Sequence, residues 1–264
     1  MARRIAVAAT GQFGADVLDR LAAEHDVVQL FTRPDKPKGR GRRVAPPPAK
    51  ETAMRLGIPF EQPAKLDSSV GVAAHTVVVC AYGLLIPSSL LERALWLNVH
   101  PSLLPRWRGA APVERAIMAG DEETGVTIHR TVEALDAGPI AAQRAFSIAP
   151  EDDAGAVYAH AAEVAAELLR DVLDKDEPTF EPQAEDGATY AEKIRPEDRQ
   201  LDLAQPAQEL VNRVRALSPH IGARLGDLLV WQARVQDDGS FEPLEVQPAG
   251  GRRMAYDAYL RGRR

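Results

Sequence analysis

An asparagine and a histidine stand two residues apart at the end of a predicted strand. Asn98 and His100 lie in and just after the apolar segment Trp96–Val99, and Pro101 follows them. Side chains two apart on an extended backbone point to the same face, and a proline stops the strand from continuing. An amide and an imidazole on one side of a cleft can exchange a proton and donate to a developing oxyanion. The spacing also fits a histidine that only caps the strand end.

Two more segments could contribute to chemistry. Residues 102–112 form a loop that prolines restrict to few shapes, with two arginines flanking Trp107. Asp136 lies in the sequence Leu-Asp-Ala-Gly between two predicted strands. Asp and Gly are also common in turns for backbone reasons alone, so Asp136 taken singly favours a turn residue over a catalyst. The loop by itself is equally a surface loop with its tryptophan in the core.

A local cluster of positive charge lies near the start of the chain. Residues 32–43 hold six cations against one acid, in a protein whose net charge is −6. Such a loop is either simply solvated or suited to phosphates and stacked bases, which arginine binds well. The cations are Arg33, Lys36, Lys38, Arg40, Arg42 and Arg43.

The elements that must position these residues alternate between strand and helix. Ile5–Ala9 predicts a strand, Phe13–Leu21 has helical spacing, and Val27–Phe31 predicts a second strand. This alternation predicts an α/β fold with a Rossmann-like, open, mostly parallel sheet. Ligands of such sheets bind beyond the carboxyl ends of the strands. Further strands are predicted at 76–81, 96–99, 124–128 and 140–146, and a long helix at 154–173.

A composition change after the long helix predicts a second domain. We expect a first domain over residues 1–175, an acidic linker with two prolines over 176–187, and a smaller mixed domain over 188–264. The last region predicts a helix at 204–217 and short strands at 228–235 and 244–246.

Composition excludes several classes of protein. The net charge of −6 argues against a protein that coats nucleic acid through overall charge. The single cysteine, Cys80, permits no intrachain disulfide, and no residue cluster has the spacing of a metal site. The first apolar run, Ile5–Ala9, is shorter than a signal peptide requires, and no run approaches a membrane span. We therefore expect a cytoplasmic protein that binds no metal and no membrane.

Taken together, the motifs resemble the formyltetrahydrofolate-dependent formyltransferase family. Its pattern is Asn-x-His-x-Ser-Leu-Leu-Pro, here residues 98–105, followed by the Leu-Asp-x-Gly turn of Asp136. Three strings are similar to one branch, the methionyl-tRNA formyltransferases: the loop 102–112, Ala119–Ile128 and Thr189–Lys193. The resemblance covers nearly the whole chain.

The resemblance implies formyl transfer from 10-formyltetrahydrofolate, used as a co-substrate, to the amine of charged initiator tRNA. Asn98 and protonated His100 would stabilise the oxyanion, and Asp136 would orient His100 and help move the proton through a water. No metal is required, and the cationic loop 33–43 would enter the tRNA acceptor stem. The implied folate-binding residues are Tyr82, Gly83, Leu84, Leu85, Ile86, Pro87, Ser102, Leu103, Leu104, Pro105, Ala134, Leu135 and Gly138.

The sequence departs from the family pattern in its first loop, Ala9–Phe13, at Pro139, and after Val235, where a barrel hairpin is missing. We therefore expect a shortened, OB-like second domain in a monomer. One alternative keeps the chemistry but changes the acceptor to a small amine, such as an amino sugar nucleotide. Another is a tRNA-binding relative without catalysis, for which three intact polar residues would have no evident use.

Overall fold

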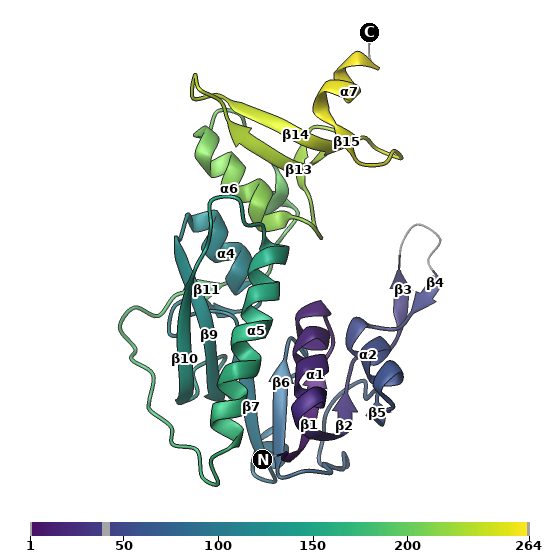
Figure 1. Cartoon of the computed structure of the whole chain (residues 1–264), viewed down its shortest axis with the longest axis vertical. Coiled ribbons are helices and arrows are strands. Elements are labelled where there is room, and N and C mark those ends of the chain that lie inside the picture. The colour runs from purple at the N-terminus through teal and green to yellow at the C-terminus, as the bar shows by residue number, and fades with distance from the viewer. Residues whose placement is uncertain (1, 39–42, 263–264) are drawn as a thin grey trace. The chain divides into compact units, whose positions relative to one another are not determined.

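The computed structural model describes residues 2–38 and 43–262, which form two compact units (Figure 1). The first unit comprises Met1–Arg106, Gly125–Arg144 and Ala159–Ala188. The second comprises Trp107–Thr124, Ala145–Tyr158 and Thr189–Arg264. The chain therefore passes between the units several times.

A seven-stranded sheet forms the centre of the first unit, with the order β10-β9-β7-β6-β1-β2-β5. The neighbours from β7 to β5 run parallel, whereas β9 pairs with β7 in the antiparallel direction. This arrangement confirms the predicted open, mostly parallel sheet. The bounds are β1 Arg4–Ala9, β2 Asp26–Phe31, β5 Phe60–Glu61, β6 Thr76–Cys80, β7 Leu95–His100, β9 Glu123–Arg130 and β10 Ile140–Ser147.

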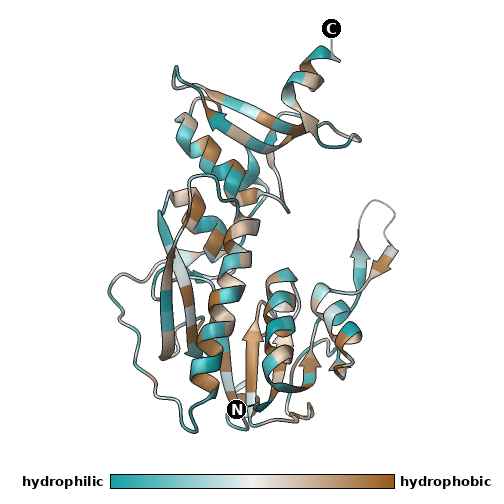
Figure 2. Ribbon diagram, in the orientation of Figure 1, coloured by the Kyte–Doolittle hydropathy of each residue, from teal (hydrophilic) through white to brown (hydrophobic). Residues whose placement is uncertain are grey.

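The central strands are buried on both faces, which explains their unbroken apolar sequences. Ile5 to Ala9 and Val77, Val78 and Cys80 are 0% exposed, and β6 is coloured as strongly hydrophobic in Figure 2. Helix α1 (Gln12–Glu24) approaches the sheet closely at Gly14. A Cβ there would lie 2.6 Å from the Cys80 carbonyl oxygen, so only glycine fits this position.

Helices α1 and α5 (Ala154–Leu173) are linked by ion pairs of Arg20 with Glu163 and of Arg170 with Glu24. The core of the first unit includes an apolar cluster that contains Ala6, Val77, Phe31 and Trp96. Helices α2 (Pro48–Leu56) and α3 (Ser88–Leu91) complete the first unit. No helix within residues 2–38 and 43–262 has the length and apolar character that a membrane span requires.

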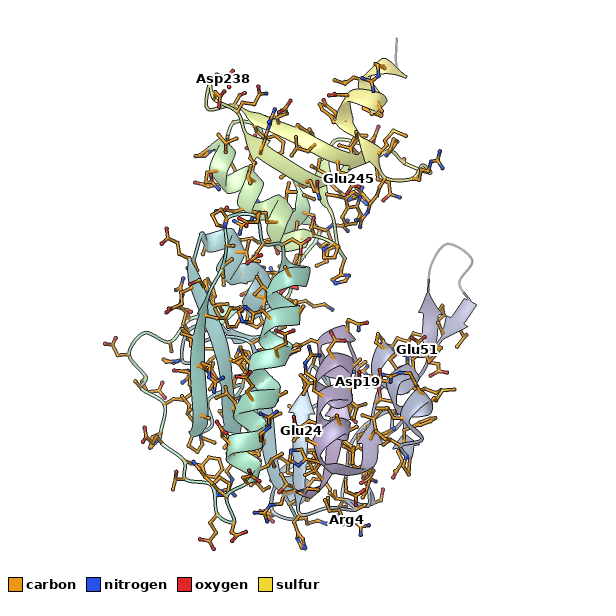
Figure 3. All side chains as sticks on the ribbon, in the orientation of Figure 1. Arg4, Asp19, Glu24, Glu51, Asp238 and Glu245 are labelled. Carbon is orange, nitrogen blue, oxygen red and sulfur yellow. The ribbon has the colours of Figure 1, made fainter. Side chains whose placement is uncertain are left out.

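The second unit contains the smaller antiparallel sheet that the sequence predicted, with the order β12-β13-β14-β15. Helix α6 (Ala207–Leu217) packs on it through Leu210 and Val214, which join Val230 and Val246 in one buried cluster. A tight turn connects β13 to β14, and Figure 3 shows Asp238 at this hairpin tip. The strands are β12 Ala223–Leu225, β13 Leu228–Val235, β14 Phe241–Gln247 and β15 Met254–Ala255.

Several short elements were not predicted from the sequence. Besides α2, α3, β5, β12 and β15, they are β3 Lys36–Lys38, β4 Arg43–Ala45, β8 Arg108–Gly109, α4 Pro112–Ala119, β11 Tyr190–Ala191, the 3-10 helix η1 Glu197–Arg199 and α7 Tyr256–Arg261. Helix α6 also begins three residues later than expected, because Pro206 occupies its N-cap position.

The predicted domain limits at residues 175 and 188 stay a prediction. The compact units divide the chain differently, since α4 and the first turn of α5 share an apolar cluster with Ala216 of α6. The segment predicted as a linker lies in the first unit.

Candidate active site

Strand β7 carries two of the predicted site residues on one face. Asn98 and His100 occupy its last positions, beside β6 on one side and β9 on the other. The antiparallel register with β9 places Asn98 opposite His129 and His100 opposite Thr127. The side chains of all four residues therefore project from the same face of the sheet.

The third predicted residue, Asp136, enters this region from the turn between β9 and β10. Its backbone has φ +47°, a conformation that Asp tolerates better than most residues. Gln183 donates hydrogen bonds to the carbonyl oxygens of Asp136 at 2.8 Å and Gly138 at 2.7 Å. A Cβ on Gly138 would lie 1.7 Å from the Arg130 carbonyl oxygen, so this turn requires glycine. Asp136 is thus a turn residue whose carboxylate also faces β7.

The carboxylate of Asp136 contacts both predicted partners. Asn98 Nδ2 donates to Asp136 Oδ1 at 3.0 Å, and His100 Nδ1 lies 3.7 Å from Oδ2. The side chains of His100 and Asp136 are only 5% and 11% exposed. A carboxylate shielded in this way can orient the imidazole and stabilise its protonated form.

Sequence reasoning missed a second histidine in the cluster. His129 is 1% exposed, and its Nε2 lies 3.1 Å from Asn98 Nδ2 and 3.6 Å from Asp136 Oδ1. Its ring centroid lies 6.4 Å from that of His100. In the sequence, His129 falls one residue beyond the predicted strand 124–128. The available signal was its alternation with Thr127, which places both residues on one face.

Hydrogen bonds from Thr127 fix the loop that follows His100. The Thr127 hydroxyl donates to the Ser102 carbonyl oxygen at 2.7 Å and accepts from the Leu104 amide at 3.2 Å. Gln143 Nε2 donates to the Thr127 hydroxyl at 2.7 Å and to the Leu104 carbonyl oxygen at 3.0 Å. This buried network holds part of the predicted folate-binding set, Ser102 to Pro105, against β9.

The segment 82–87 lies beyond the carboxyl end of β6. Two of its carbonyl oxygens are held from other strand ends: Thr10 donates to Tyr82 at 2.9 Å, and Arg33 Nη1 donates to Gly83 at 2.7 Å. Burial raises the pKa of Tyr82 to about 12, against the opposing effect of the Arg33 charge. Leu85 is 82% exposed. The segment therefore has a fixed backbone and an apolar side chain open to a ligand.

The remaining predicted folate residues differ in exposure. Leu135 is 62% exposed, and Ala134 and Gly83 are also exposed. Ile86 is buried in the apolar cluster around Trp96, with Leu84 packed against it. Within residues 2–38 and 43–262, no group of three or more acidic, histidine or cysteine side chains could hold a metal ion.

The cationic segment forms an antiparallel hairpin of β3 and β4, with Lys36 exposed. Lys50 forms an ion pair with Asp35 at 2.8 Å, and Gln62 donates to the Arg33 carbonyl oxygen at 2.8 Å. The base of the hairpin is therefore tied to the first unit. The predicted tRNA-binding residues Arg40 and Arg42 lie outside the described residues.

An open α/β sheet with polar residues at its carboxyl edge is typical of ligand-binding proteins, and comparisons with known proteins identify the family. Residues 3–173 match the formyl transferase family, and residues 193–243 match the formyl transferase C-terminal domain. A methionyl-tRNA formyltransferase of Halorhodospira halophila is 40% identical over 100% of this chain and 97% of its own length. That of Methylococcus capsulatus is 39% identical over 97% of this chain and 96% of its own length.

Solved structures share the fold at lower identity. A Clostridium thermocellum methionyl-tRNA formyltransferase has a TM-score of 0.64 at 14% identity, over 94% of this chain and 99% of its own. A Helicobacter canadensis N-formyltransferase in complex with folinic acid and dTDP-3-aminofucose has a TM-score of 0.68 at 16% identity, over 90% and 89% of the two chains. The chain belongs to the methionyl-tRNA formyltransferase family of formyl transferases, which confirms the resemblance seen in its motifs.

Proposed function

We propose that this chain transfers the formyl group of 10-formyltetrahydrofolate to the amino group of methionyl initiator tRNA. The observation that carries the proposal is 37–40% identity to methionyl-tRNA formyltransferases along nearly the whole chain. The cluster of Asn98, His100 and Asp136 supports it, because amide, imidazole and carboxylate groups suit proton transfer beside a carbonyl carbon.

The reaction needs a proton to move while the formyl oxygen gains charge. The amine forms a bond to the formyl carbon, the bond from that carbon to N10 of folate breaks, and a proton of the amine ends on N10. In our proposal, protonated His100 donates to the formyl oxygen. Asp136, 3.7 Å from His100 Nδ1, orients the ring and helps to move the proton through a water. Asn98 adds its amide to the same site.

The proposed folate site fits an aromatic ring system. Leu85 and Leu135 belong to the two segments proposed to bind folate, and their large apolar side chains are 82% and 62% exposed. A flat ring placed against them would remove apolar surface from water, which stabilises a complex. The fixed backbone of segment 82–87 supplies polar groups at the same place, as specific small-molecule sites commonly do.

The tRNA side of the proposal depends on the cationic hairpin. Lys36, Lys38 and Arg43 lie in β3 and β4, and Arg40 and Arg42 fall between these residues in the sequence. We propose that these residues contact the acceptor stem of initiator tRNA, and that the protein acts as a cytoplasmic monomer.

A small amine is the second candidate acceptor. Its support is the departure of the first loop after β1, Ala9–Phe13, and of the shortened second domain from the family pattern. The likeness in fold to amino-sugar formyltransferases supports it less, because identities of 15–16% indicate the fold alone.

An acceptor assay separates these candidates. Purified protein and 10-formyltetrahydrofolate are mixed with charged initiator tRNA or with an amino sugar nucleotide, and formylated product is measured. We expect formylation of the charged tRNA at a kcat/KM well above that for the sugar. The reverse preference would replace tRNA with the small amine, and no transfer to either would contradict formyl transfer itself.

A further inference from the structure

We infer that His129 is a positioning residue: it fixes the amide of Asn98 so that the amide carbonyl oxygen, not the amide nitrogen, is presented to the substrates. The inference rests on the proposed function, since it assigns a role within the same site. Nothing in the motif pattern assigns a role to His129.

The surroundings of the His129 ring favour one tautomer. Its Nδ1 lies 3.1 Å from the Arg130 carbonyl oxygen, and a carbonyl oxygen can only accept a hydrogen bond. Nδ1 therefore carries the proton. In a neutral imidazole the other nitrogen, Nε2, then has a lone pair and is an acceptor.

The partners of the Asn98 amide favour one orientation of its nitrogen and oxygen. Asn98 Nδ2 lies 3.1 Å from His129 Nε2 and 3.0 Å from Asp136 Oδ1. An amide nitrogen has two N–H donors, and each finds an acceptor in this arrangement. Rotating the amide by 180° would place its oxygen against the lone pair of the histidine and against a carboxylate oxygen. Acceptor would face acceptor on both sides, so one orientation is strongly favoured.

This orientation of the Asn98 amide has a consequence for the reaction. With both N–H groups committed, the amide of Asn98 has no donor left for the formyl oxygen. Among the described residues, Asn98 Oδ1 accepts no hydrogen bond. An amide oxygen without a partner in the protein can accept an N–H of the incoming amine and hold the lone pair of the amine toward the formyl carbon. His100 then remains as the imidazole donor to the oxygen. This differs from the role as an oxyanion donor that the family resemblance implies for Asn98.

The inference also explains why His129 is buried. Its ring is 1% exposed, and β9 places it directly opposite Asn98. A solvated acceptor would exchange with water and leave the amide free to turn. A shielded acceptor holds the Asn98 amide in a single orientation, because an unpaired buried N–H group is costly.

Two substitutions in the full chain test the role of His129. His129→Leu keeps apolar bulk but removes the acceptor, whereas His129→Gln supplies a side-chain oxygen that can accept from Asn98. We expect His129→Leu to lower kcat about tenfold while the KM for folate stays within about twofold. His129→Gln should recover most of that loss. Wild-type kcat in a folded His129→Leu protein would overturn the inference.

A double-mutant cycle distinguishes positioning from general structural support. If His129 acts through Asn98, His129→Leu should have little further effect on kcat in an Asn98→Ala protein, because coupled residues are not additive. Losses that multiply would show that His129 acts independently of Asn98 and would overturn the inference.

The tautomer itself can be measured in the unsubstituted protein, independently of any variant. Long-range ¹⁵N–¹H spectra should show a protonated Nδ1 and an unprotonated Nε2 for His129. A proton on Nε2 would overturn the inference, whatever the acceptor. Absence of formyl transfer by the wild-type protein, with the expected tautomer present, would instead count against the proposed function.

Discussion

The cluster at the end of β7 and the arginines of the second unit use polar side chains in different ways. In the cluster, the amide nitrogen of Asn98 lies within hydrogen-bond distance of two other members of the site, His129 and Asp136. In the second unit, Arg215 donates to the carbonyl oxygens of Ala149 and Asp152 at 2.7 and 2.8 Å. Charge counted along a sequence therefore overestimates the charge available to RNA.

Arg213 and Arg253 follow the same rule as Arg215. Arg213 donates to the Gln200 carbonyl oxygen at 2.8 Å, and the Arg253 guanidinium lies 3.6 Å from the Trp231 ring centre. In the structure each of these three arginines has a partner within its own unit, whereas Arg252 is an exposed arginine beside Arg253.

The largest expected effect comes from breaking the cluster. We expect His100→Ala to fold with a wild-type melting temperature but to lose at least about 100-fold in kcat, as the loss of a general acid–base group predicts. Single-turnover kinetics with saturating folate measure this effect. An equally folded variant with normal turnover would remove His100 from the mechanism.

A matched pair of substitutions tests the arginines of the second unit. Arg215→Ala should lower the free energy of unfolding by about 2 kcal/mol, since it removes charge-assisted hydrogen bonds. The salt dependence of tRNA binding by this variant should not differ from that of the wild-type protein. Arg252→Ala, at an exposed position, should leave stability unchanged, and urea unfolding compares the two. Equal stability of both variants would contradict the structural role of Arg215.

Substitutions in and beside the cationic hairpin separate structural residues from tRNA-binding residues within the first unit. Arg33→Ala should weaken binding of a stable folate analogue about fivefold by releasing the Gly83 carbonyl oxygen. Arg40→Ala with Arg42→Ala should leave folate binding unchanged and flatten the salt dependence of tRNA use, because fewer counterions are released. Calorimetry on the full chain measures the affinity for the folate analogue, and kcat/KM at several salt concentrations measures the salt dependence of tRNA use. If the double variant formylates charged tRNA normally, the hairpin is only a solvated loop.

The smallest expected effect concerns Glu114 in α4. Burial raises its pKa, although the Tyr158 hydroxyl donates to it at 2.9 Å. The folded state then holds a proton more tightly than the unfolded state, so this group lowers stability as pH rises above its unfolded pKa. Glu114→Gln keeps an acceptor for Tyr158 and removes the charge. We expect thermal unfolding at pH 4 to show no difference and at pH 8 to show a more stable variant.

Much of the fold was predictable because its signals are local. The apolar strands of the first unit, the helix at 154–173 and the turn chemistry around Asp136 all follow from neighbouring residues. The short elements were not predictable in the same way. Helix α4 has only eight residues, and the first turn of α5 and part of α6 complete its apolar contacts.

The sequence by itself determined that Asn98 and His100 share a face, because side-chain direction on a strand depends only on the residue count. It also determined that a Leu-Asp-Ala-Gly segment would turn. The tertiary structure decided that His129 stands opposite Asn98, that Gln183 holds the Asp136 turn, and that Arg33 is tied to Gly83. These contacts join residues 31 to 50 positions apart. They depend on which strands become neighbours, which is a property of packing over the whole sheet and not of any local pattern.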